Sequence, residues 1–429
     1  MTDLSQKTAL VFDHGNYLET AIALSKGFGK VLYHVPWEFG TSHLNDAMVG
    51  EGFDEIEVCP DPFDPDVLSK IDICVFPDVQ HGGLQLLLES LGKRVWGSRK
   101  ADRLELDREF LKEHQAKIGM DVPPHDVVVG MKELERYLID HDGEELYIKV
   151  SKYRGSWETK KFTKLSLIRG WLDIKRIEFN AAQNDVPFVI EKKINAKVEV
   201  GGDMICIDGR IPSIVMHGPE IKNKAYIGVV TPYDKLPDEI KEANEFVMPF
   251  MRKERFRNFW TMEMRDTYLT DPTCRMPSPA GEAQMANYKN LCEIIWEGAA
   301  GELVEPETRF KYVVQVMVEH DDNPRGGRVV EIPDSIRDCV FISNACKMDG
   351  LYHLVPQPEP CDESFGWVLG MGDTIQEAVD HCKEVAEKLK DQPVTVHLEA
   401  LVDAVQAVQE EEDAGIDFAK QVPEPADVL

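Results

Sequence analysis

The sequence predicts an α/β domain followed by a larger α+β region. Over residues 1–98, short β-branched or aromatic runs alternate with helical patterns, which is typical of a parallel sheet covered by helices. Between about residues 145 and 275 strand patterns dominate, with helices at Leu165–Ile174 and Pro237–Met251. A further strand-rich stretch follows residue 300 and leads into a helix that starts at a capping box of Thr374 and Glu377.

The first domain resembles a nucleotide-binding sheet in pattern but lacks its phosphate-binding turn. Asp13-His14-Gly15-Asn16 stands at the first strand-to-helix turn, where a dinucleotide-binding sheet carries GxGxxG. His81-Gly82-Gly83 at a later helix start either binds an anion or shapes a turn. The expected strands of this domain are Thr8–Phe12, Lys30–Val35, Glu55–Cys59, Ile71–Phe76 and Arg94–Trp96.

Two further expectations concern the rest of the chain. The charged, helical pattern from Arg99 to Ile118 predicts one long helix. At the other end, a helix over about Thr395–Gln409 runs into Glu410-Glu411-Glu412-Asp413, and we expect the acidic residues 406–429 to form a disordered tail.

Composition excludes several classes of protein. The 429 residues carry a net charge of −29, and such a field repels a phosphate backbone, so nucleic acid is not an expected partner. No run of residues approaches the roughly 18 apolar residues of a membrane span, and the amino-terminal residues do not resemble an export signal. The nine cysteines are scattered without CxxC spacing, which favours neither disulfides nor zinc and predicts a cytoplasmic protein.

Lys149 is the first candidate for binding a charged ligand. Period-two alternation puts Leu146, Ile148 and Val150 on one face of a strand and Lys149 on the other. A lysine among buried strand residues needs an anion or a carboxylate partner. The loop 151–161 that follows is rich in hydroxyls and cations, so it either holds a polyphosphate or is a solvated basic hairpin.

A pair of carboxylates forms the second candidate site. Residues 259–275 predict two strands joined by a turn near Thr267, which places Glu263 opposite Asp271. Directly opposed residues have Cβ atoms about 5 Å apart, and two carboxylates at that distance repel unless a cation lies between them. Mg²⁺, bound by one or two carboxylates and phosphate oxygens, meets that need. The alternative is two edge carboxylates that point into water.

Arg275 follows Asp271 by four residues. Its guanidinium either contacts a phosphoryl group or substrate carboxylate, or forms a surface salt bridge.

The order of these segments resembles the ATP-grasp ligase superfamily, and most of all its phosphoribosylamine–glycine ligase (GAR synthetase) branch. Asp271-Pro272-Thr273-Cys274-Arg275 is similar in form to the family's E-F-N-x-R metal motif. The resemblance implies that Asp271 and Thr273 are metal ligands, with Glu263 as the first acidic ligand and Arg275 as a catalytic residue. Asp for Glu is a mild change, whereas Thr for Asn replaces an amide oxygen by a shorter hydroxyl.

Other segments extend the resemblance over about residues 90–390. The segment 95–110 is similar to the family's I-F-G-P-[ST]-K-A…E-x-[SD]-K-x-F entry, with an arginine in place of its phosphate-contacting lysine, and 188–194 resembles the adenine-binding hinge. The family's glycine-rich substrate segment is missing, and residues 216–228 occupy its interval. The nucleotide-binding residues that the resemblance implies are Arg108, Lys149, Arg154, Gly155, Ser156, Glu191, Ile194 and Glu199.

The resemblance implies both an architecture and a reaction. The expected parts are a pre-ATP-grasp α/β domain (1–98), a two-lobed ATP-grasp domain (99–300), a small α+β carboxy-terminal domain (301–405) and the tail (406–429). The implied function is ligation of a small-molecule carboxylate to an amine with ATP and Mg²⁺ (or Mn²⁺), through an acyl phosphate and with release of ADP and phosphate. Two alternatives are a divergent phosphoribosylamine–glycine ligase of purine biosynthesis and a degenerate protein that binds ATP without turnover.

Overall fold

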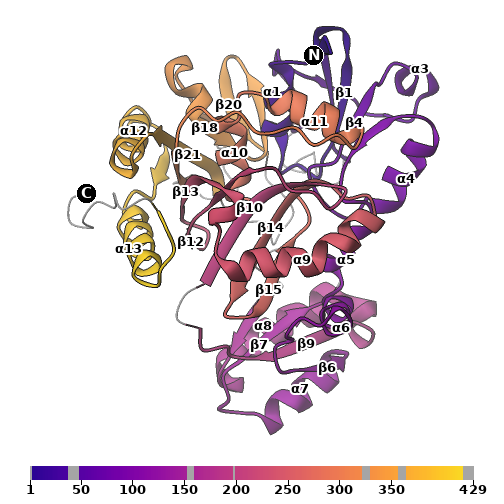
Figure 1. The fold of residues 1–429 in the computed structure, drawn as a ribbon, viewed down its shortest axis with the longest axis vertical. Coiled ribbons are helices and arrows are strands. Elements are labelled where there is room, and N and C mark those ends of the chain that lie inside the picture. The colour runs from indigo at the N-terminus through magenta and orange to yellow at the C-terminus, as the bar shows by residue number, and fades with distance from the viewer. Residues whose placement is uncertain are drawn as a thin grey trace. The chain divides into compact units, whose positions relative to one another are not determined.

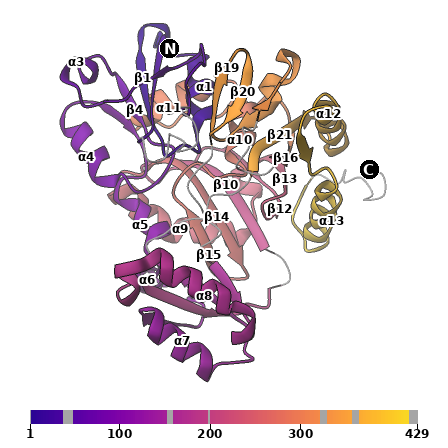
Figure 2. The ribbon, with the colours of Figure 1, turned by 180° about the vertical axis from the view of Figure 1, so that it is seen from behind.

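The computed structural model describes residues 2–36, 48–151, 159–196, 199–320, 329–355 and 364–418. The chain divides into two compact units. The larger unit comprises residues 1–101, 200–261 and 274–429, and the smaller comprises 102–199 and 262–273. Figures 1 and 2 show the elements of each unit from opposite sides.

The first sheet of the larger unit is parallel, as its sequence pattern predicts. Its strand order is β3-β2-β1-β4-β5, and Ala9 of β1 pairs with both Val31 and Ile73. The strands are β1 (Thr8–Phe12), β2 (Lys30–His34), β3 (Glu57–Val58), β4 (Ile73–Val75) and β5 (Arg94–Trp96). The helices are α1 (Leu18–Ser25), α3 (Pro65–Leu68) and α4 (Gly82–Ser90).

A second, mainly antiparallel sheet belongs mostly to the larger unit, whereas its strand β15 and the end of β14 belong to the smaller unit. It runs in the order β14-β10-β11-β13-β16-β21-β18, with β12 paired to β13, β22 paired to β16, and β15 paired to β14. Its strands are β10 (Glu199–Ile207), β11 (Ile214–His217), β12 (Glu220–Ile221), β13 (Ala225–Pro232), β14 (Arg257–Arg265), β15 (Tyr268–Thr273), β16 (Tyr312–His320), β18 (Val340–Ile342), β21 (Ser364–Gly372) and β22 (Val394–Val396). A small third sheet contains β17 (Val329–Val330), β19 (Ala345–Met348) and β20 (Leu351–Leu354).

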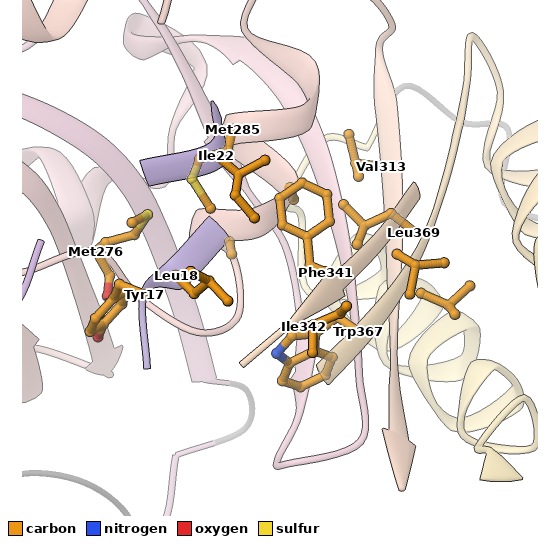
Figure 3. Packing of buried hydrophobic residues seen from close by; sticks show 14 of the residues in the cluster. Tyr17, Leu18, Ile22, Met276, Met285, Val313, Phe341, Ile342, Trp367 and Leu369 are labelled. Atoms are coloured by element: carbon orange, nitrogen blue, oxygen red, sulfur yellow. The ribbon is translucent and has the colours of Figure 1, made fainter. Parts of the chain in front are cut away.

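Helices cover this second sheet and bury its apolar face. They are α9 (Asp238–Lys253), α10 (Gly281–Asn287), α12 (Ile375–Glu387) and α13 (Ala400–Asp413), whereas α11 (Leu291–Ala299) packs on β5 of the first sheet. The capping box predicted at Thr374 and Glu377 is present at the start of α12. In both views α12 and α13 lie side by side (Figures 1 and 2). Figure 3 shows Leu18 and Ile22 of α1 near Met285 of α10 and Phe341 of β18 in the largest hydrophobic cluster.

The chain remains ordered further toward its end than the acidic composition predicts. Residues 406–413 belong to α13, and Phe418 is fully buried, with its backbone oxygen accepting a 2.7 Å hydrogen bond from Tyr312. The expectation of disorder from residue 406 is therefore wrong as far as Phe418. Apolar positions in α13, such as Leu401 and Val405, explain the order, because their burial offsets the repulsion among the acidic residues. Residues 419–429 lie outside the described residues.

The smaller unit is a four-stranded antiparallel sheet with helices. The strand order is β6-β9-β7-β8, with β6 (His125–Val129), β7 (Leu146–Val150), β8 (Thr159–Phe162) and β9 (Pro187–Lys192). The helices are α5 (Arg103–Leu106), α6 (Arg108–Ile118), α7 (Met131–Asp140) and α8 (Leu165–Phe179). Its core buries Leu146, Ile148 and Val150 together with residues of α7 and α8. The mixed α/β and α+β fold class is thus confirmed.

In the described part of the chain, no helix has both the length and the apolar character that a bilayer crossing requires.

Candidate active site

Arg108 and Asp271 are neighbours in the smaller unit. The helix expected over Arg99–Ile118 is interrupted at Asp107, whose side chain accepts a 3.1 Å hydrogen bond from Phe110 N and so caps α6. Arg108 is consequently the first residue of α6, and its Nη1 lies 2.8 Å from Oδ1 of Asp271 on β15. The Arg108 side chain is 5% exposed and that of Asp271 37%, so the carboxylate remains accessible to a ligand.

Lys149 has the orientation that its strand pattern predicts. The three apolar residues of β7 face the core, and Lys149 is buried on the other side of the strand. Its Nζ donates to Thr270 O at 3.0 Å and lies 3.0 Å from Oε2 of Glu191. The buried ammonium therefore has a carboxylate partner, as its position requires.

Glu191 on β9 is shared by two lysines. Its Oε1 lies 2.6 Å from Nζ of Lys112, and both side chains are at least 95% buried. Burial alone would raise the pKa of Glu191, but Lys149 and Lys112 together outweigh burial and lower the pKa to about 2. Burial lowers the pKa of Lys112 to about 8, because Glu191 offsets only part of the desolvation.

Lys112 is a site residue that the sequence interpretation missed. It lies four residues after Arg108 on α6, and residues at that spacing share one face of a helix. The signal was therefore present in the pair Arg108 and Lys112. Together with Lys149, these cations form a cluster that we call the cation cluster, and its carboxylate partners are Glu191 and Asp271.

The residues expected to bind the nucleoside, Ile194 and Glu199, lie in different surroundings. Ile194 is half-buried just after β9. Glu199 begins β10, and its carboxylate forms an ion pair with Arg265, which the sequence interpretation did not foresee. The predicted phosphate-loop residues Arg154, Gly155 and Ser156 lie outside the described residues.

The predicted opposition of Glu263 and Asp271 is wrong by one residue. The turn is a two-residue one, Asp266 and Thr267, so counting along the hairpin puts Glu263 across from Thr270. Thr270 Oγ1 accordingly donates to Glu263 O at 3.1 Å. Strict alternation from this turn sends the two carboxylates to opposite faces, so a metal ion shared between them has no support from the register.

Two of the residues that the sequence resemblance assigns to a metal ion lie on β15. Asp271 and Thr273 lie two residues apart, and alternation puts both side chains on one face of the strand. A carboxylate and a hydroxyl, completed by phosphate oxygens and water, suit Mg²⁺ chemically. Among the described residues, no group of three or more His, Cys, Asp or Glu side chains could hold a metal ion.

Arg275 lies in the larger unit and is not a surface residue. Its side chain is 15% exposed; Nη1 donates to Tyr17 Oη at 2.8 Å, and Nε lies 3.9 Å from Oδ1 of Asp78. Tyr17 Oη in turn donates to Met276 O, and Figure 3 shows the two residues adjacent. The alternative of a solvent-exposed salt bridge is excluded by this burial.

No protein-family model matches the chain, and no curated protein matches it in sequence. Solved structures do match. Phosphoribosylamine–glycine ligase of Thermotoga maritima is similar over 91% of this chain and 97% of its own, with 18% identity and a TM-score of 0.65. The biotin carboxylase domain of Hydrogenobacter thermophilus 2-oxoglutarate carboxylase, in complex with MgADP, ADP and bicarbonate, covers 96% and 99%, with 14% identity and a TM-score of 0.63. N5-carboxyaminoimidazole synthetase of Staphylococcus aureus, complexed with ADP, covers 89% and 97%, with 16% identity and a TM-score of 0.55.

The chain has the ATP-grasp fold. The likeness spans nearly the whole length of each of these ATP-grasp structures, so it includes the parallel amino-terminal sheet as well as the smaller unit. The resemblance read from the sequence and the likeness of the folds thus agree, although they rest on different observations. At 14–18% identity the likeness shows the fold alone.

Proposed function

We propose that the protein is an ATP-dependent ligase that joins a small-molecule carboxylate to an amine through an acyl phosphate. The observation that carries the proposal is the cation cluster, which brings Arg108, Lys112 and Lys149 together beside Asp271 in a chain with the ATP-grasp fold. Two of the similar structures are complexes with ADP, one of them with magnesium. A cluster of cations beside an accessible carboxylate suits a polyphosphate that carries a divalent ion.

The proposed site residues bind phosphate, bind the metal ion or stabilise developing charge. Arg108 and Lys149 hold the phosphates of ATP, and Glu191 orients Lys149 and Lys112 through its ion pairs with them. Asp271 and Thr273 hold Mg²⁺, which neutralises the charge of the phosphates when it is bound. Arg275 stabilises the charge that develops when phosphate leaves the acyl carbon. The protein contributes positioning and charge neutralisation, which is most of the catalysis in phosphoryl transfer.

We keep Arg154, Gly155 and Ser156 as proposed phosphate contacts, and Ile194 and Glu199 as proposed contacts to the nucleoside. Glu199 pairs with Arg265 through Oε2, so its Oε1 is the oxygen that would accept from ribose hydroxyls. Glu263 remains a proposed metal ligand. Because it lies across from Thr270, its position supports this role less than the position of Asp271 supports a metal-binding role for Asp271. The side chain of Glu191 contributes through its ion pairs with Lys112 and Lys149. We propose that the backbone after β9, and not this carboxylate, contacts adenine.

A phosphoribosylamine–glycine ligase is the second candidate. The likeness to the Thermotoga maritima enzyme over 91% of this chain favours it, whereas the missing glycine-rich substrate segment counts against it. Product formation from phosphoribosylamine and glycine separates this candidate from other carboxylate–amine ligases.

The test uses hydroxylamine, which traps acyl phosphates as hydroxamates. The full chain is incubated with Mg-ATP, hydroxylamine and pools of amino acids and small carboxylic acids, and both ADP and hydroxamate are measured. Carboxylate-dependent ADP release with an equal amount of hydroxamate supports the ligase. Thermal stabilisation by Mg-ATP without ADP release from any pool would instead favour the degenerate, binding-only alternative.

A further inference from the structure

A second group of ionisable side chains lies at the carboxyl edge of the parallel sheet. Strands β1 and β4 are adjacent in the order β3-β2-β1-β4-β5. From β1 the chain adds β2 and β3 on one side, and it then adds β4 and β5 on the other side, so the strand order changes direction between β1 and β4. In open α/β sheets ligands bind beyond the carboxyl ends of the strands at such a switch point. Here His14 follows β1, Asp78 follows β4, and His81 is the residue before α4.

These three side chains form a continuous chain of contacts, which we call the histidine relay. Asp78 Oδ2 lies 3.2 Å from Nδ1 of His14, and Nε2 of His14 lies 2.9 Å from Nε2 of His81. The two imidazole planes are inclined by only 23°. The Asp78 side chain is 1% exposed and that of His14 9%, whereas His81 is half-buried. The relay thus runs from a buried carboxylate to an imidazole near the surface.

The order of the contacts fixes where the protons lie. An ionised Asp78 can only accept, so Nδ1 of His14 carries the hydrogen of this contact, and in the singly protonated ring Nε2 is the acceptor. Nε2 of His81 must then donate, which leaves Nδ1 of His81 as an acceptor. Gly83, two residues after His81, is exposed, and a Cβ built on it meets no atom within 4 Å, so this start of α4 faces solvent.

Asp78 links the histidine relay to Arg275, a residue of the proposed ligase reaction. Asp78 Oδ1 lies 3.9 Å from Nε of Arg275, so one carboxylate contacts both His14 and the arginine assigned to charge stabilisation. Among the described residues, Asp13 and His34 are two further ionisable groups near the imidazoles. Burial lowers the pKa of His81 to about 4, with a further contribution from His14, so His81 is neutral at pH 7. The buried carboxylate of Asp78 is the counter-charge at the inner end of the contacts that join His81 to His14.

We propose that the histidine relay accepts the proton of the amine substrate of the ligase, which binds at the carboxyl edge of β1 and β4. This inference rests on the proposed function. The bound ammonium gives one proton to Nδ1 of His81, and the neutral amine then attacks the carbonyl carbon of the acyl phosphate. The new C–N bond forms, the C–O bond to phosphate breaks, and phosphate leaves with the electron pair. The second amine proton goes to the leaving phosphate, so one proton stays on the relay and later passes to water.

His81→Gln tests the relay in the full chain, with His353→Gln on β20 as a half-buried control in the same unit. Amine-dependent ADP release from the pooled substrates should fall 100-fold or more in His81→Gln, which is the usual contribution of a general base. Hydroxylamine is unprotonated at neutral pH, so it should restore hydroxamate formation to within about threefold of the wild type. Unchanged amine-dependent turnover, or a loss that hydroxylamine does not restore, would overturn the relay.

Nuclear magnetic resonance of the ¹⁵N-labelled histidines tests the relay even if the proposed ligase activity fails. The relay requires that His14 be in its Nδ1–H form in the wild type. It also requires that the titration curve of His81 differ between the wild type and the variants His14→Gln and Asp78→Asn. Absence of ADP release from every pool, combined with such coupled titration, would refute the ligase and not the relay. An Nε2–H form of His14, or identical His81 titration in all three proteins, would refute the relay itself.

Discussion

Nη1 of Arg108 lies 2.8 Å from Oδ1 of Asp271, which joins the first residue of helix α6 to strand β15. This contact brings a cation from the segment resembling a phosphate-binding entry next to the carboxylate that resembles a metal ligand. Because the residues are 163 positions apart in sequence, their proximity is a property of the fold. The first prediction concerns this carboxylate.

Replacement of Asp271 by Asn should lower the rate of ADP release at least about 100-fold, because an amide binds Mg²⁺ far less well than a carboxylate. Asp271 is partly exposed and Asn keeps an oxygen that can accept from Arg108, so the melting temperature should change less than in Glu191→Gln. Asp266→Asn in the exposed turn of the same hairpin is the control, since Asn tolerates its positive φ of 52°. Wild-type turnover in Asp271→Asn would remove the metal-site assignment.

Replacement of Lys149 by Met should eliminate the thermal stabilisation that Mg-ATP gives the wild type. The methionine keeps the apolar stem in place but removes the ammonium between Thr270 O and Glu191. Lys132→Met on the exposed face of α7 removes one positive charge from the same unit and should leave the stabilisation intact. A nucleotide-induced shift of equal size in Lys149→Met and Lys132→Met would contradict the assignment of Lys149.

Replacement of Glu191 by Gln should destabilise the protein by about 3–5 kcal/mol, because it leaves two buried ammonium groups without their carboxylate. Glu145→Gln is a matched control: Glu145 also pairs with two lysines, but at the surface, so its loss should matter little. Denaturant unfolding of the two variants measures the difference. Equal stability of both would show that the buried pairs do not stabilise the fold.

Acid should weaken the same interaction. The pKa of Glu191 is lowered to about 2 in the folded protein from an ordinary 4.5, so its contribution to stability is complete above pH 4.5. Protonation of the unfolded chain begins near that pH, and the contribution falls as the pH drops from 4.5 toward 2. Comparison of wild type and Glu191→Gln across this range should show the stability difference shrink. A difference that does not depend on pH would contradict the lowered pKa.

Replacement of Arg275 by Gln should reduce turnover about 100-fold while nucleotide binding stays near the wild-type level, because its described contacts are to Tyr17 and Asp78 in the larger unit. Arg309→Gln, an exposed arginine of the larger unit, is the control. A parallel loss of turnover and nucleotide affinity would make Arg275 a nucleotide-binding residue instead.

The sequence predicted the parts of the site that depend on local pattern. Lys149 was recognisable because its apolar neighbours alternate with period two, and the capping box of Thr374 and Glu377 follows a local rule. The partner of Lys149 was not recognisable, since Glu191 comes from a strand 42 residues away and only sheet pairing brings them together. The relay of His14, Asp78 and His81 escaped for the same reason.

The hairpin register failed for a different physical reason. Without a glycine, the sequence gives no clear turn signal, and the turn was centred on Thr267. In the structure Asp266 adopts a positive φ of 52°, which permits a two-residue turn and shifts the register by one residue. A shift of this size reverses the face of every side chain on one strand, so Glu263 lost the position expected of it.

The central claim is that Asp271 holds the metal ion of a bound nucleotide. Electron paramagnetic resonance of Mn²⁺ in the presence of ATP tests it directly, because the spectrum reports the surroundings of the ion and not the completed reaction. The wild type should immobilise Mn-ATP, and Asp271→Asn should leave its spectrum close to that of Mn-ATP free in solution. Equal immobilisation by the two proteins would contradict the claim.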